Sequence, residues 1–179
     1  MKKKVISIVA VVLVLCCAIG GTLAWLTDKT ASVTNTFTVG DINIELTETT
    51  TNYKMVPGKT ITKDPVVKVE ANSEACWLFV KVEKSSNFDN FMTYEMADGW
   101  TALPGVAGVY YREVAATTTA TELSVLKDNS VLVKDSVTKA DLNALTRDTF
   151  PTLTFTAYAV QSDGITDVTT AWAEAQKAA

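Results

Sequence analysis

The sequence predicts an all-β fold, a jelly-roll-like antiparallel β-sandwich with a short inserted helix and a short C-terminal helix. Short segments of alternating apolar and polar residues recur between turn signals, which is typical of sandwiches and barrels. Threonine, which favours half-exposed sheet surfaces, clusters at residues 47–51 and 117–121. Helical spacing replaces the alternation near residues 138–147 and near the C-terminus. The long return connections of a jelly roll or Greek key fit this order best.

The first two alternating segments change phase between residues 31 and 46. Apolar residues occupy odd positions up to Val39 and even positions from Ile42 to Leu46. Since successive side chains of a strand point to opposite faces, a bulge or corner at Gly40 and Asp41 is needed to keep both sets in one core. We therefore expect two strands that meet at a corner. The apolar face of the first strand consists of Ala31, Val33, Phe37 and Val39.

Further strand signals follow, each bounded by residues that favour turns. Cys76–Lys84 is the clearest, because its apolar residues alternate over the whole segment. Asp98 and Gly99 predict a β-hairpin leading into Trp100. Residues 87–96 fit neither a strand nor a helix clearly. The other strands expected are 65–69, 108–114, 122–126, 131–133 and 151–159.

Two segments have helical spacing. Thr138 is followed three residues later by Asp141, a pair that resembles a capped helix N-terminus, and it predicts a helix at 138–147. The alanine-rich tail around Trp172 predicts a short helix over residues 169–178.

The N-terminus predicts a secretory signal peptide. Three lysines at positions 2–4 precede an apolar run over residues 5–19, which is shorter than the roughly 20 residues of a membrane-spanning helix. Thr22 and Ala24 supply the small side chains that signal peptidase accepts, so we expect cleavage between Ala24 and Trp25. Residues 1–24 are then the signal peptide, and residues 25–179 form a single secreted domain with no stable membrane anchor. An uncleaved N-terminal anchor is the alternative.

Composition narrows the chemistry. The sequence contains no histidine, which excludes a Ser-His-Asp or Cys-His catalytic pair and any His-ligated zinc site. Only Cys76 remains after cleavage, so no internal disulfide forms. The net charge of −4 argues against nucleic acid or an anionic membrane surface as a partner. We expect no catalytic residues, no metal and no cofactor.

Individual residues have two interpretations each. Cys76 is expected to be a buried small hydrophobe rather than a reactive thiol. Asp163 and Gly164, near Asp167, suggest a plain turn more than a calcium loop. A set of aromatic residues could form a glycan-binding platform, although core packing is the preferred interpretation. That set is Trp77, Trp100, Trp172, Tyr110 and Tyr111.

Several stretches resemble one protein family. Residues 20–28 and 35–40 resemble the N-terminus of the TasA/camelysin family of Gram-positive extracellular proteins, which are exported with a SipW-type signal peptidase. Residues 57–82, 153–161 and 171–172 fit the same family, whereas the region from 87 to 136 matches no motif.

The resemblance implies a jelly-roll subunit of biofilm matrix fibres, with residues 25–39 as a donor strand that completes the sheet of a neighbouring copy. Implied partners are other copies of the chain, the signal peptidase during export and sibling matrix proteins. A cell-surface adhesion or glycan-binding module is the main alternative. Camelysins have also been described as surface metalloproteases, but the sequence has no His-Glu-x-x-His motif.

Overall fold

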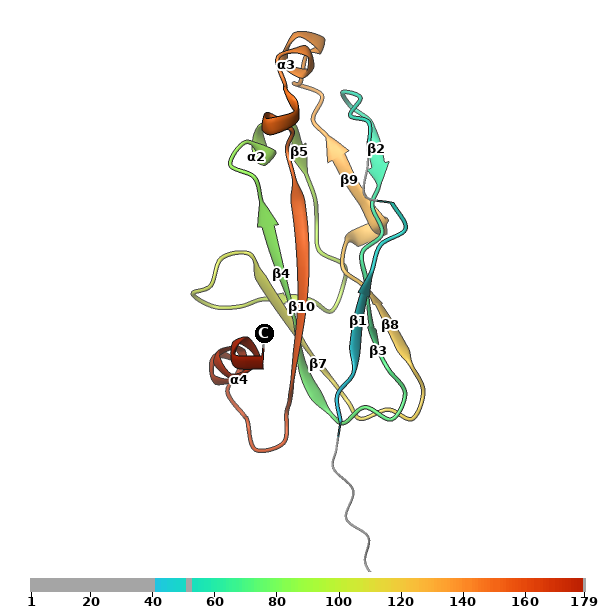
Figure 1. The fold of residues 1–179 in the computed structure, drawn as a ribbon, viewed down its shortest axis with the longest axis vertical. Helices are drawn as coiled ribbons and strands as arrows, with labels where there is room; N and C mark the ends of the chain where they lie inside the picture. The colour runs from blue at the N-terminus through green and yellow to red at the C-terminus, as the bar shows by residue number, and fades with distance from the viewer. Residues whose placement is uncertain (1–40, 51–52, 179) are drawn as a thin grey trace, which may run out of the picture. The chain divides into compact units, whose positions relative to one another are not determined.

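The computed structural model describes residues 41–50 and 53–178, which belong to one compact unit spanning residues 39–179 (Figure 1). The predicted signal peptide, the cleavage site at Ala24 and Trp25, and the predicted donor strand lie outside the described residues. Gly40 of the predicted corner also lies outside them. The donor-strand residues concerned are Ala31, Val33, Phe37 and Val39.

The described residues form an antiparallel all-β fold with a few short helices, which confirms the predicted fold class. The strands are β1 (Ile44–Thr47), β2 (Thr60–Thr62), β3 (Val66–Val69), β4 (Cys76–Lys84), β5 (Met92–Thr93), β6 (Thr101–Ala102), β7 (Val109–Val114), β8 (Thr121–Ser124), β9 (Ser130–Val133) and β10 (Leu153–Gln161). The helices are α2 (Phe88–Phe91), α3 (Lys139–Asn143) and α4 (Val168–Ala175), with 3-10 turns at Lys127–Asn129, Arg147–Thr149 and Gln176–Ala178.

The strands pair in three ladders, with the orders β10-β4-β7-β6, β1-β3-β8 and β2-β9-β5. The second and third ladders follow the same two chain segments, because β2 leads into β3 and β8 leads into β9. Between them, residues 125–129 lie opposite residues 63–65, joined by hydrogen bonds from Val125 N to Pro65 O and from Lys63 N to Asn129 O. An excess of two residues on one strand preserves the inward and outward alternation, so the two ladders act as one layer.

The main core lies between this layer and the β10-β4-β7-β6 sheet. Val67 and Val69 of β3 pack with Leu78 and Val80 of β4, and all four are fully buried. The alternation predicted for Cys76–Lys84 is therefore confirmed. The opposite face of β4 is also covered, which explains why this strand is apolar on both sides.

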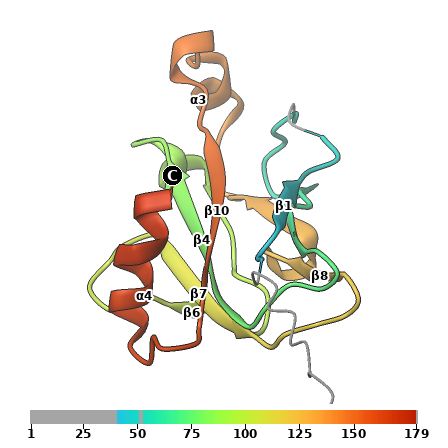
Figure 2. The same ribbon diagram turned by 60° about the horizontal axis from the view of Figure 1, so that its bottom comes forward.

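Helix α4 covers that opposite face (Figure 2). Trp172 packs against Phe79 of β4 and Tyr158 of β10, with ring centroids 5.2 and 5.1 Å apart. The Asp167 carboxylate caps the helix by accepting a hydrogen bond from Thr170 N at 2.8 Å. The predicted C-terminal helix is thus confirmed, and Asp167 acts as its cap. Within residues 41–50 and 53–178, no helix is long and apolar enough to cross a membrane.

Two local predictions need correction. The hairpin predicted at Asp98 and Gly99 is wrong: the chain turns there, but β5 before it pairs with β9 and β6 after it pairs with β7. The turn serves to bury Trp100, whose indole N–H donates to Ser124 O at 2.8 Å. The helix predicted at 138–147 ends at Asn143, although the Thr138–Asp141 capping box is present as expected.

Candidate functional site

One edge of strand β10 lacks a partner strand in the described part of the chain. On its other side β10 pairs with β4 in a register where Leu153 lies opposite Lys84. Hydrogen bonds from Ser85 N to Thr152 O and from Ser162 N to Ala75 O show that even-numbered residues face β4. The N–H and C=O groups of the odd-numbered residues therefore point away from β4, towards the open edge.

The same odd-numbered residues direct their side chains into the core. Leu153, Phe155, Ala157 and Ala159 are half-buried against the main core cluster. The edge therefore combines a row of backbone hydrogen-bonding groups with incompletely covered apolar side chains. An edge of this kind is a template for the addition of another strand.

Strand β1 forms the corresponding edge of the opposite layer. Glu70 N donates to Asn43 O, so odd-numbered residues of β1 face β3 and even-numbered residues present their backbone groups to the other side. Ile44 and Leu46 are half-buried against the same core cluster as the residues of β10. The two edges approach each other along part of their length, and they border one opening into the sandwich at Leu46 and Thr47 of β1 and at residues 153–155 of β10.

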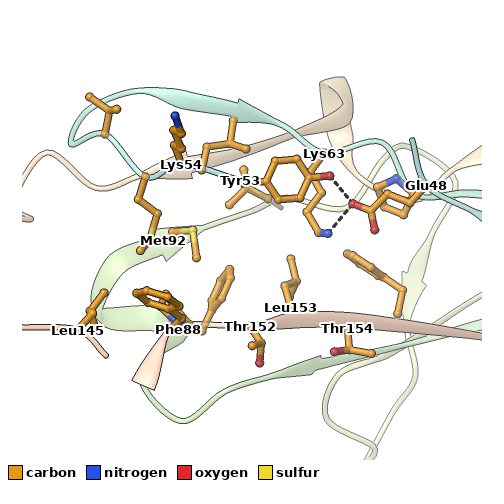
Figure 3. Close-up of a pocket in the computed structure, with 18 of the residues that line it drawn as sticks. Glu48, Tyr53, Lys54, Lys63, Phe88, Met92, Leu145, Thr152, Leu153 and Thr154 are labelled. Carbon is orange, nitrogen blue, oxygen red and sulfur yellow. Dashed lines mark hydrogen bonds and ion pairs between the residues drawn. The ribbon is translucent and has the colours of Figure 1, made fainter. Parts of the chain in front are cut away.

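A cavity of about 1000 Å³ occupies this opening (Figure 3). Its walls come from the end of β1, the segment before β2, strand β10 and the residues just before β10. The lining is predominantly apolar, and Figure 3 places Phe88, Met92 and Leu145 towards one end. We call this cavity and the β10 edge beside it the groove. Its apolar lining includes Leu46, Met55, Val56, Ile61, Phe88, Met92, Val131, Leu142, Leu145, Phe150, Leu153 and Phe155.

A single ion pair lies at the other end of the groove among its described residues. Lys63 Nζ lies 2.6 Å from Glu48 Oε1, and the Tyr53 hydroxyl donates to the same carboxylate oxygen at 2.6 Å (Figure 3). Lys63 is only 8% exposed. Its ammonium also lies 5.1 Å from the centroid of the Tyr53 ring and 5.3 Å from that of Phe155, distances that allow cation–π attraction.

The local fold explains how this charge is held in an apolar site. Lys63 follows β2 at the irregular stretch between the two ladders, where its N–H bonds Asn129 O. Asp64 accepts a hydrogen bond from Thr49 N at 3.2 Å, which holds the segment of Glu48 beside Lys63. The hydrogen bonds from Thr49 also lower the pKa of the Asp64 carboxyl. Burial and the neighbouring Glu48 raise the pKa of the Tyr53 hydroxyl, so Tyr53 stays protonated and donates.

This arrangement is suited to binding a ligand. The backbone groups on the edge of β10 and the donors and acceptors of the Lys63–Glu48 pair are the groups that could contact it. Within residues 41–50 and 53–178, no three His, Cys, Asp or Glu side chains are placed to hold a metal ion.

The structure also places the other residues singled out in the sequence. Cys76 is fully buried, as predicted, and burial raises the pKa of its thiol to about 11. Trp100 and Trp172 are buried in the core clusters, which confirms the packing interpretation for both. Asp163 and Gly164 lie in a turn, where Gly164 has a φ of 77°.

Sequence reasoning missed the groove, including Glu48, Tyr53 and Lys63. One signal was present: Ile61, Lys63, Pro65 and Val67 occupy alternate positions, so the lysine falls on the inward face of an otherwise apolar series. That pattern could have identified a buried lysine, although not its partner.

Comparison with known proteins gives one match. Residues 1–75 match the model of the family described as camelysin metallo-endopeptidase, a range that contains Glu48, Tyr53 and Lys63 of the groove and the predicted donor strand. Neither a curated protein nor a solved structure gives a significant match to the chain. The resemblance of this protein to the TasA/camelysin family is thereby confirmed over residues 1–75.

Proposed function

We propose that this protein is a secreted structural subunit of extracellular matrix fibres, in which residues 25–39 of one copy bind as a strand in the groove of the next copy. The observation that carries this proposal is the open edge of β10 beside an apolar groove. The family match over residues 1–75 supports it at a coarser level.

The physical basis is strand addition. Backbone groups of Leu153, Phe155, Ala157 and Ala159 would bond the added strand, and its apolar side chains would fill the groove. Ala31, Val33, Phe37 and Val39 provide such side chains at alternate positions. Because the donor segment and the groove are different surfaces of one chain, the contact runs head to tail and extends into a filament unless rotation closes it into a ring.

Export precedes assembly in this scheme. Signal peptidase would cut between Ala24 and Trp25 and free residues 25–39 for binding outside the cell. The fibre then belongs to the extracellular matrix or cell surface, where sibling matrix proteins with similar donor segments could join it.

The test is electron microscopy of the purified mature protein, residues 25–179. We expect filaments from the natural sequence and none from Phe37→Asp, because burying a phenylalanine side chain contributes roughly 1.5–3 kcal/mol at each junction. Thr36→Asp is the matched control, since it places the same charge on the opposite face of the strand. Circular dichroism should show a folded β protein in all three cases. Equal loss of filaments in both variants, or a natural protein that stays monomeric, would contradict the proposal.

The description of the matching family favours one other function, peptidase activity. We infer that this chain does not act as a zinc peptidase, because its sequence has no histidine for a His-Glu-x-x-His site. Incubation of the mature protein with labelled casein and zinc, with and without a chelator, tests this inference. Chelator-sensitive cleavage that copurifies with the protein would show it to be wrong.

A further inference from the structure

The ion pair in the groove has unused hydrogen-bonding capacity. Among the described residues, the only hydrogen bond of the Lys63 ammonium goes to Glu48 Oε1, although an ammonium has three N–H donors. The Tyr53 hydroxyl donates to Oε1 as well, whereas Glu48 Oε2 accepts no hydrogen bond from a described residue. A strand that fills the groove would displace water from these groups. Buried polar groups left without partners would then oppose binding.

The donor segment carries one polar residue on its apolar face. The odd-numbered positions from 31 to 39 read Ala31, Val33, Asn35, Phe37 and Val39. In an extended strand these side chains share one face, so Asn35 enters the groove together with its apolar neighbours. An asparagine side chain buried without partners carries the same penalty as the unused groups of the ion pair.

The unused hydrogen-bonding groups of the ion pair and those of the Asn35 side chain are chemically complementary. The Asn35 carboxamide has an oxygen that can accept from Lys63 and an NH₂ group that can donate to Glu48. We propose that Asn35 of one copy binds the Lys63–Glu48 pair of the next copy and thereby sets the register of the added strand. This inference rests on the proposed function, and it identifies the residue of the donor segment that the groove recognises.

The position of Lys63 indicates the register. Since the ammonium lies 5.3 Å from the ring centroid of Phe155, Asn35 is placed opposite Phe155. In an antiparallel alignment, Phe37 then lies opposite Leu153, and its ring enters the apolar end of the cavity lined by Phe88 and Met92. Val33 lies opposite Ala157, which does not line the cavity.

The direction also favours a second copy over the chain's own segment. Strand β1 runs against β10 (Figure 1), so a segment that folds back from residue 41 beside β1 would run parallel to β10. With Asn35 at the ion pair, that parallel strand would place Phe37 opposite Ala157 and Val33 opposite Leu153, at the end lined by Phe88 and Met92. The large side chain would then lie opposite a residue that does not line the cavity.

The test is a double-mutant cycle that measures the critical concentration for assembly of the mature protein. In the natural groove, Asn35→Leu should raise the critical concentration by about tenfold or more, the size expected for losing hydrogen bonds to charged groups. In a groove made apolar by Glu48→Leu with Lys63→Met, the same Asn35→Leu change should lower the critical concentration. This reversal of sign follows from the pairing, because leucine suits an apolar groove and asparagine does not.

Thermal unfolding of each monomer below its critical concentration verifies that every variant is folded. Lys59→Met is the matched control for charge, since Lys59 is exposed and does not line the groove. If Asn35→Leu changes the critical concentration by the same factor in both grooves, the pairing is wrong while the fibre function stands. A natural protein that never assembles would refute the fibre function and the pairing together.

Discussion

At the scale of single residues, Cys76 shows how a strand position determines reactivity. Its side chain lies on the face of β4 that carries Leu78 and Val80, and it is fully buried. Burial raises the pKa of the thiol to about 11, so near neutral pH the group is both shielded and protonated. The thiolate is the nucleophile, which makes this cysteine inert in the folded protein.

We expect the thiol reagent DTNB to label Cys76 slowly in the native protein and rapidly in denaturant. Cys76→Ala should lower the free energy of unfolding by about 1 kcal/mol, since it removes a small buried group. A native labelling rate equal to the rate in denaturant would show that the site opens readily.

Asp167 gives a prediction on pH dependence. Its carboxylate accepts hydrogen bonds from Thr169 and Thr170 at the start of α4, and these lower its pKa from 3.8 to about 2. Because the folded pKa is depressed, the cap stabilises the protein above the unfolded pKa and is lost as the pH falls from 3.8 towards 2. Asp167→Ala should lower the melting temperature at pH 6, and the difference from the natural protein should shrink as the pH falls from 3.8 and be largely lost at pH 2 and below. A difference that persists unchanged at pH 2 would mean that charge on Asp167 is not the cause.

Residue patterns show which parts of the site were predictable. The alternation of Ile61, Lys63, Pro65 and Val67 reveals that the lysine faces inward. The partner Glu48 precedes Lys63 by 15 positions and reaches it only because β1 pairs with β3. Local alternation records which face a residue occupies, whereas strand pairing over long distances decides what it meets.

At the scale of elements, β10 explains both the predicted and the missed features. Its alternation of Leu153, Phe155, Ala157 and Ala159 predicts a strand with one inward face. Whether its edge is open depends on which strands lie beside it, and alternation contains no information on that. The hairpin prediction at Asp98 and Gly99 is wrong for the same reason. The turn signal was correct, but β5 before the turn pairs with β9 and β6 after it pairs with β7.

A disulfide trap tests the alignment of the added strand against β10. A chain carrying both Val33→Cys and Ala157→Cys should form covalent multimers under oxidation, because directly opposed residues of a hydrogen-bonded antiparallel pair have Cα atoms about 5.5 Å apart, which suits a disulfide. Non-reducing electrophoresis would show a ladder of multimers. The matched control is Val33→Cys with Leu153→Cys, which tests the parallel alignment. A ladder from the control alone, or a monomer with an internal disulfide, would contradict the antiparallel alignment between copies.

At the scale of the whole molecule, the two halves of the proposed junction lie at different places in the chain. The described residues form three apolar clusters, two of which meet the groove through Phe155 and Leu153. The cluster under α4 is remote from the groove and contains none of its lining residues. The cluster under α4 is therefore independent of what fills the groove. The fold class followed from alternation along the sequence, but the groove could not be predicted, because it arises from two edges of opposite layers.

This independence leads to the last prediction, which concerns removal of the donor segment. A mature chain that lacks residues 25–39 should fold, because the described residues by themselves form three apolar clusters with fully buried members such as Val67, Leu78 and Phe79. It should also fail to form filaments, since it retains a groove but has no strand to donate. Size-exclusion chromatography and circular dichroism would establish a folded monomer, and electron microscopy would establish the loss of filaments.

A synthetic peptide of residues 25–39 should then bind the truncated chain with a stoichiometry of one to one and raise its melting temperature, because a ligand of the folded state alone stabilises it. Added to the natural protein, the peptide should shorten filaments by occupying the groove at the growing end. The Phe37→Asp peptide is the control and should do neither. If the truncated chain unfolds outright and the peptide does not restore it, residues 25–39 belong to the core of their own subunit, and exchange between copies would not be the basis of assembly.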